Sequence, residues 1–116
     1  MGLDNFAVLP QQTNNLWTNA PDEKFKGIQL CGGIHSGGDS SASFRGKVYR
    51  KNILQATGVD IQTKYLSPSE LEELLIKMSN TRLDAWGDGI TLNEIANLKR
   101  FIQVCITHGY GLAGWW

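Results

Sequence analysis

The end signals of two helices constrain the fold of this chain most tightly. Ser67–Glu70 and Thr91–Glu94 both have the pattern of a capping box, in which the hydroxyl and the carboxylate each accept a hydrogen bond from the other residue's backbone N–H. Pro68 occupies the first helical position of the earlier box, where its missing N–H is no loss. Each box therefore predicts the start of a helix.

The residues behind the two boxes have the spacing of an apolar helix face. Hydrophobic side chains recur every three or four positions in both segments, at Leu71, Leu74, Leu75 and Met78 and at Ile95, Leu98, Phe101, Ile102, Cys105 and Ile106. Gly109 fits the left-handed position that ends the later helix, with Tyr110 packing back in a Schellman arrangement.

A third helix is predicted from Ser43 to Thr57, with Ser41 or Ser43 as its N-cap. Its apolar face would consist of Phe44, Val48, Tyr49, Ile53 and Ala56. At helical spacing, Arg45 and Asn52 fall inside this face beside Tyr49. A buried arginine is costly unless it is paired. We therefore expect Arg45 either to bind carbonyl or acidic groups of the core or to line a ligand pocket.

The strand signals are weaker. Residues 25–34 alternate imperfectly and predict a strand, and residues 59–66 are expected to be extended. The C-terminal GLAGWW is costly to leave in water, so we expect it to form a short strand or to dock on the core beside the 25–34 strand. Residues 1–24 are expected to form an irregular N-terminal arm or a short helix, or to be partly mobile.

Together these segments indicate an α+β fold, with about three helices packed on a small sheet of two to four short strands. An all-α fold is the alternative if the glycine-rich segments are only loops. The length of 116 residues suits a single domain, 1–116.

Composition narrows the function classes. The chain has 11 Lys+Arg and 11 Asp+Glu, so it lacks the basic excess of a dedicated nucleic-acid binder. It has no apolar run long enough to span a membrane and no secretory signal, so we expect a cytoplasmic protein with no membrane partner. Cys31 and Cys105 form no metal or redox motif, so we expect both to be reduced, buried thiols.

One stretch could hold a ligand, namely the Gly/Ser loop of residues 35–43 and the helix start behind it. Backbone amides, hydroxyls and an arginine at a helix N-terminus bind phosphate and carboxylate. The candidate ligand-binding residues are His35, Ser36, Ser40, Ser41, Ser43, Arg45, Tyr49 and Asn52. The loop matches neither the P-loop nor the dinucleotide-binding glycine pattern, so a solvated connection is the alternative.

The sequence contains no established catalytic or metal-binding spacing. We therefore expect neither a cofactor nor a metal, and the leading hypothesis is a small non-enzymatic binding protein: a protein-interaction, immunity-like or regulatory factor. The alternative is a binder of a small anionic ligand, such as a nucleotide or phosphate, through the Gly/Ser loop and Arg45. A hydrolase that uses His35 and Asp39 as an acid–base pair is the third hypothesis.

Two short motifs carry a family resemblance. SSASFRGKVY at residues 40–49 and GLAGWW at residues 111–116 resemble a family of small uncharacterised bacterial proteins. Members have a Phe-Arg-Gly-Lys-Val-Tyr helix start, an acidic mid-helix and a Gly-Leu-x-Gly-Trp-Trp C-terminus. The resemblance covers roughly residues 40–116 and implies no activity. It implies that one structural unit contains Phe44, Arg45, Gly46, Tyr49, Trp115 and Trp116.

Overall fold

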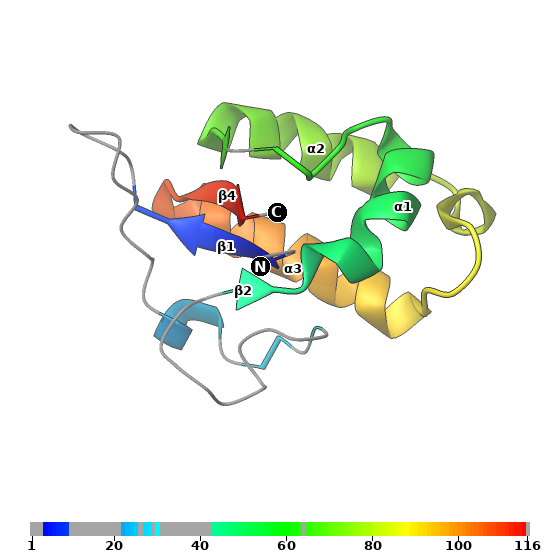
Figure 1. Cartoon of the computed structure of the whole chain (residues 1–116), viewed down its shortest axis with the longest axis horizontal. Coiled ribbons are helices and arrows are strands. Elements are labelled where there is room, and N and C mark those ends of the chain that lie inside the picture. Colours follow the sequence, from blue (N-terminus) through cyan, green and yellow to red (C-terminus); the bar gives the residue numbers. More distant parts are fainter. Residues whose placement is uncertain are drawn as a thin grey trace.

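A four-stranded antiparallel sheet and three α-helices make up the part of the chain described by the computed structural model, which covers residues 4–9, 22–25, 27–28, 30, 43–63 and 65–115 (Figure 1). The elements in chain order are β1 (Asp4–Val8), the short 3₁₀ helix η1 (Asp22–Phe25), β2 (Ser43–Phe44), α1 (Gly46–Thr57), β3 (Tyr65–Leu66), α2 (Pro68–Asn80), the 3₁₀ helix η3 (Leu83–Trp86), α3 (Leu92–His108) and β4 (Gly111–Trp115). The predicted α+β fold is confirmed.

The sheet joins the two ends of the described chain. Its strand order is β2-β1-β4-β3. The central strands β1 and β4 pair along their whole length, from Asp4 opposite Trp115 to Val8 opposite Gly111. The two edge strands are only two residues long, which leaves little exposed ladder for another strand to extend.

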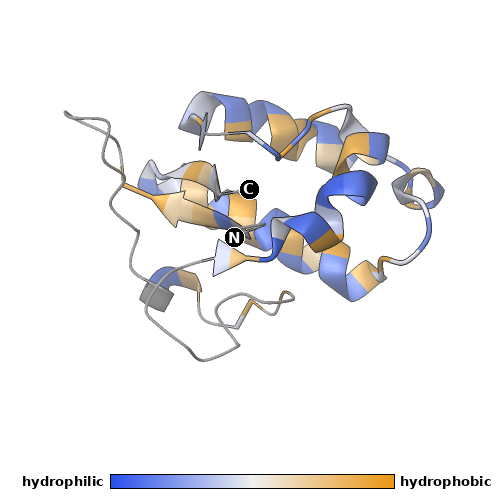
Figure 2. Ribbon diagram, viewed as in Figure 1, coloured by the Kyte–Doolittle hydropathy of each residue, from blue (hydrophilic) through white to orange (hydrophobic). Residues whose placement is uncertain are grey.

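The helices pack with the sheet around one buried cluster. Figure 1 shows α3 behind the central strands, with α2 alongside and α1 at one end of the helical layer. The ring of Phe101 on α3 lies 4.6 Å from that of Phe25 and 5.0 Å from that of Phe44, measured between centroids. Figure 2 shows hydrophobic residues through β1 and β4 and in stripes along the helices. Burial of these stripes drives the packing.

The predicted starts of α2 and α3 and the predicted end of α3 are confirmed. In both capping boxes the hydroxyl accepts from the N3 backbone N–H and the glutamate accepts from the N-cap N–H. At the end of α3, Gly109 is left-handed with φ 72°, and its N–H donates to the carbonyl of Ile106. The Tyr110 N–H reaches back to the Cys105 carbonyl at 2.8 Å, which completes the Schellman arrangement.

The strand predictions needed correction. Asp4–Val8 is a central strand rather than an irregular arm or helix, because its partner is the C-terminal segment. Residues 25–30 do not continue as a strand where the structure describes them: Phe25 ends η1, and Gly27 has φ 87°. The rest of the predicted 25–34 strand lies outside the described residues.

The prediction that the C-terminal segment forms a short strand is correct, but the strand predicted to lie beside it is wrong. Gly111–Trp115 is a strand, but it pairs with β1 on one side and with β3 on the other. Leu112 is fully buried. The extended segment predicted at residues 59–66 is confirmed in part, because Tyr65 and Leu66 form the strand β3.

Candidate functional site

Half of the predicted site cannot be placed. The residues His35, Ser36, Ser40 and Ser41 lie outside the described part of the chain, as does Cys31. Ser43, Arg45, Tyr49 and Asn52 are described, and they do not come together at one surface.

Ser43 and Arg45 show where α1 truly begins. Ser43 lies in β2 opposite Phe6 and is not the N-cap. Arg45 holds the N-cap position with extended backbone, makes no capping bond with its side chain and is exposed. The predicted burial of Arg45 is wrong because the helix starts at Gly46, after a residue pair that the sheet holds extended. The prediction that Val48 is buried is also wrong, since it is 43% exposed.

Tyr49 is a core residue whose hydroxyl makes a hydrogen bond. Its side chain is 1% exposed, and its ring lies edge-on to Phe44 at 6.0 Å. Its hydroxyl donates to Glu94 Oε2 at 3.1 Å. The other oxygen of Glu94 accepts from the backbone of Thr91 in the α3 capping box. Tyr49 thus links α1 to the start of α3, which is a structural use of its hydroxyl.

Asn52 fixes the turn that precedes α3. It is 7% exposed, and its Nδ2 donates to the carbonyl of Trp86 at 2.6 Å and to that of Asp88 at 3.0 Å. Both amide hydrogens are therefore used within the fold. Trp86 itself is 1% exposed and belongs to the core.

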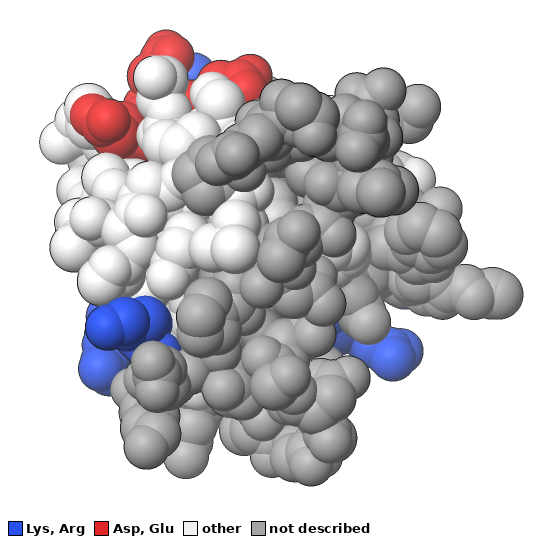
Figure 3. Space-filling model, turned by 90° about the vertical axis from the view of Figure 1, so that its left-hand side faces the viewer, with Lys and Arg blue, Asp and Glu red and all other residues white. Residues whose placement is uncertain are grey.

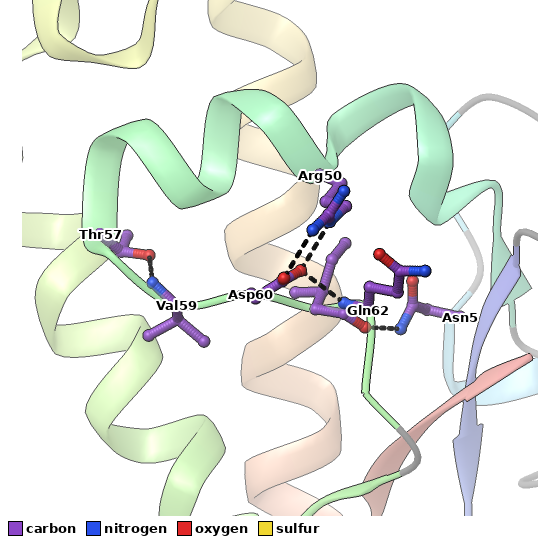
Figure 4. Close-up of polar contacts among 7 residues, drawn as sticks. Asn5, Arg50, Thr57, Val59, Asp60 and Gln62 are labelled. Carbon is purple, nitrogen blue, oxygen red and sulfur yellow. Dashed lines mark hydrogen bonds and ion pairs between the residues drawn. The ribbon is translucent and has the colours of Figure 1, made fainter. Parts of the chain in front are cut away.

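An ion pair anchors the segment that follows α1 (Figure 4). Arg50 Nε and a terminal nitrogen of its guanidinium each lie 2.7 Å from one oxygen of Asp60, and Asp60 also accepts from the Gln62 backbone N–H at 2.9 Å. The hydrogen bond from Arg50 lowers the pKa of Asp60 from 3.8 to about 2. Both side chains are 39% exposed, so solvent screens much of their attraction.

Asn5 ties the same segment to the sheet. Its Nδ2 donates to the Ile61 carbonyl at 2.9 Å, and the side chain is fully buried (Figure 4). Its Oδ1 is buried and has no hydrogen-bond partner among the residues that the structure describes. Neither Asn5 nor Asp60 could be singled out from the sequence, because their partners lie elsewhere in the chain and no local pattern marks them.

The outer face of α1 is basic and partly apolar. Residues 43–57 contain four Lys or Arg and no Asp or Glu. At about 100° per residue, Lys47 and Lys51 fall between Val48 on one side and Leu54 on the other. All four are exposed, Val48 by 43% and Leu54 by 39%. We call these four residues the α1 outer face.

The outer face of α2 has the opposite charge. Glu72 and Glu73 are exposed one turn before Ile76, which is 60% exposed. We call these three residues the α2 outer face. Glu70 adds a further acidic group in the first turn. Figure 3 shows acidic side chains gathered at the top of the molecule, at the height of α2 in Figure 1. The balanced total charge thus conceals a separation of charge between two neighbouring helices.

Few reactive groups occur in the described ranges. Cys105 is a free, buried thiol, and burial raises its pKa far above its usual value, so it is a poor nucleophile. No group of three or more His, Cys, Asp or Glu in these ranges could hold a metal ion. Among the helices described, none is long and apolar enough to cross a membrane.

Comparison of the chain with protein-family models, with curated protein sequences and with solved structures finds no match. The geometry of the molecule must therefore carry any functional argument.

Proposed function

We propose that this protein is a non-enzymatic binding protein that docks an acidic partner protein on the α1 outer face. The observation that carries the proposal is the exposure of Lys47 and Lys51 between the exposed apolar side chains of Val48 and Leu54. An immunity-like or regulatory factor would act through such a surface.

The chemistry of this face suits a protein more than a small molecule. Charges of one sign attract a partner of the opposite charge, and the exposed apolar side chains beside them offer surface that a partner protein can bury. Folding does not account for these charges, because α1 buries its other face, with Tyr49, Asn52 and Ile53.

A peptide titration tests this function. The probe is a fluorescent synthetic amphipathic helix whose leucine stripe is flanked by glutamates, and its control carries lysines in place of the glutamates. We expect the acidic peptide to bind saturably and the lysine-flanked control peptide not to bind. Reversing both charges with Lys47→Glu/Lys51→Glu should weaken binding about tenfold or more, and added salt should weaken it in the wild type. Equal binding of both peptides would refute the proposal.

A second candidate, binding of a small anion, is favoured by the start of α1. Arg45 is exposed at the N-cap, where it adds a positive charge to the partial positive charge of the helix N-terminus, and the first turn contains no acidic residue. Calorimetric titration with inorganic phosphate tests it. The second candidate requires saturable heat in the wild type that Arg45→Gln reduces, and it is wrong if phosphate binds neither protein.

A further inference from the structure

The acidic partner that fits the α1 outer face is present in the molecule itself. We infer that the protein forms a two-fold dimer in which the α1 outer face of each chain docks on the α2 outer face of the other. This inference rests on the proposed function and names the partner for the same surface. Its basis is charge complementarity: Lys47 and Lys51 on one helix, Glu72 and Glu73 on the next.

The C-terminal ends of α1 and α2 are tied together. Thr81 follows α2 directly, and its hydroxyl lies 3.0 Å from the Ala56 carbonyl of α1 and 2.6 Å from the Lys77 carbonyl of α2. Leu54 and Ile76 lie within one helical turn of this junction, and both are exposed. Figure 1 likewise shows the end of α2 beside α1.

This arrangement is self-complementary. Leu54 and Ile76 lie near the junction, basic groups lie toward the N-terminal half of α1, and acidic groups lie toward the N-terminal half of α2. A two-fold axis through the junction places the basic half of each chain opposite the acidic half of the other and sets the apolar side chains together at the centre. One contact is thus made twice, as in other isologous dimers.

The residues exposed on this surface also determine how strong the dimer should be and how it should respond to salt. The exposed apolar side chains on these helices are few, namely Val48, Leu54 and Ile76, and the charges lie where salt screens them. We therefore expect an association that depends on protein concentration and weakens as salt is added. Lys77, in the last turn of α2, lies at the junction and leaves the separation of charge between the two ends intact.

A charge-swap experiment tests the inference by sedimentation velocity. The first variant, Lys47→Glu/Lys51→Glu, makes both outer faces acidic. The second, Glu72→Lys/Glu73→Lys, makes both basic. Each variant alone should remain a monomer at concentrations where the wild type is dimeric, and an equimolar mixture of the two should form a one-to-one heterodimer. The control Gln103→Glu changes an exposed residue of α3 and should dimerise as the wild type does.

The outcomes separate this inference from the function on which it rests. Circular dichroism melts first establish that both variants fold as the wild type does, and single reversals at Lys51 and Glu73 replace any double variant that does not. A wild type that stays monomeric at all concentrations and salts overturns the dimer, as does a mixture that forms no heterodimer. If the monomeric wild type still binds the acidic peptide, the proposed function stands without the dimer. If it does not, both fail.

Discussion

Helices α1 and α2 touch each other but differ in what they bury and in what they expose. The inner face of α2 is purely apolar, with Leu71, Leu74 and Met78. That of α1 includes Tyr49 and Asn52, whose polar groups bond to α3 and to the turn before it. Outside, α1 is basic and α2 acidic. Folding requires that the inner face of each helix can be buried, but it does not determine the charge of the exposed face. The charges of the exposed faces can therefore reflect function.

The largest expected effect breaks the inner face of α2. Leu74→Ala should lower the free energy of unfolding by about 2–5 kcal/mol, because it removes a 1% exposed side chain and leaves a cavity. The matched control is Ile76→Ala on the outer face of the same helix, which should stay within about 0.5 kcal/mol of wild type when both are measured at concentrations where the protein is monomeric. Urea denaturation measures both. Equal losses would show that the two faces are wrongly assigned.

The inner face of α1 should depend on its polar groups as well as on its apolar packing. Asn52→Ala leaves the carbonyls of Trp86 and Asp88 without their donor and should cost about 1–3 kcal/mol of unfolding free energy. Lys51→Ala, the exposed neighbour, should cost little. Thermal melts compare the two variants, and an Asn52→Ala protein that melts at the wild-type temperature would contradict a structural role for the two hydrogen bonds of Asn52.

The start of α2 offers a smaller test. Ser67→Ala removes the hydroxyl that accepts from the Glu70 backbone N–H at 3.2 Å and should cost about 1 kcal/mol. Ser69→Ala, two residues later and exposed, should be close to neutral. Denaturant midpoints compare the pair, and a larger loss at Ser69 than at Ser67 would refute the assigned cap.

The smallest expected effect is a loss of folding stability at low pH. Asp60 has a pKa of about 2 in the folded chain, below its ordinary 3.8, because Arg50 donates to it. Its contribution to stability is therefore complete above pH 3.8 and lost as pH falls through about 2. Asp60→Asn should flatten this part of the stability–pH curve. A curve that Asp60→Asn leaves unchanged would show that the ion pair has no energetic role.

The helices could be predicted because their signals are local. Both capping boxes and the Gly109 end are complete within a few residues. The start of α1 was misplaced because Ser43 and Phe44 pair with β1, a contact that no local pattern reveals. The helical phase was right for Tyr49, Asn52 and Ile53, and it failed for Arg45, which precedes the helix.

The sheet could be predicted only in part, because its central pair joins opposite ends of the chain. Asp4–Val8 has no clear alternation, and its partner is the C-terminal strand. The site was harder still. Asn52 was singled out for its unusual place on an apolar face, and the structure explains that place by two buried carbonyls. The opposed charges of α1 and α2 are visible in the sequence, but their proximity depends on the packing of the two helices.

The most direct test of the central claim, that the α1 outer face is the binding surface, is a map of backbone amide chemical shifts in the wild type titrated with the acidic peptide. We predict the largest changes at Lys47, Val48, Lys51 and Leu54, with Asn52 and the β4 strand little affected. Changes that centre on the sheet or on α2, with α1 silent, would contradict the account.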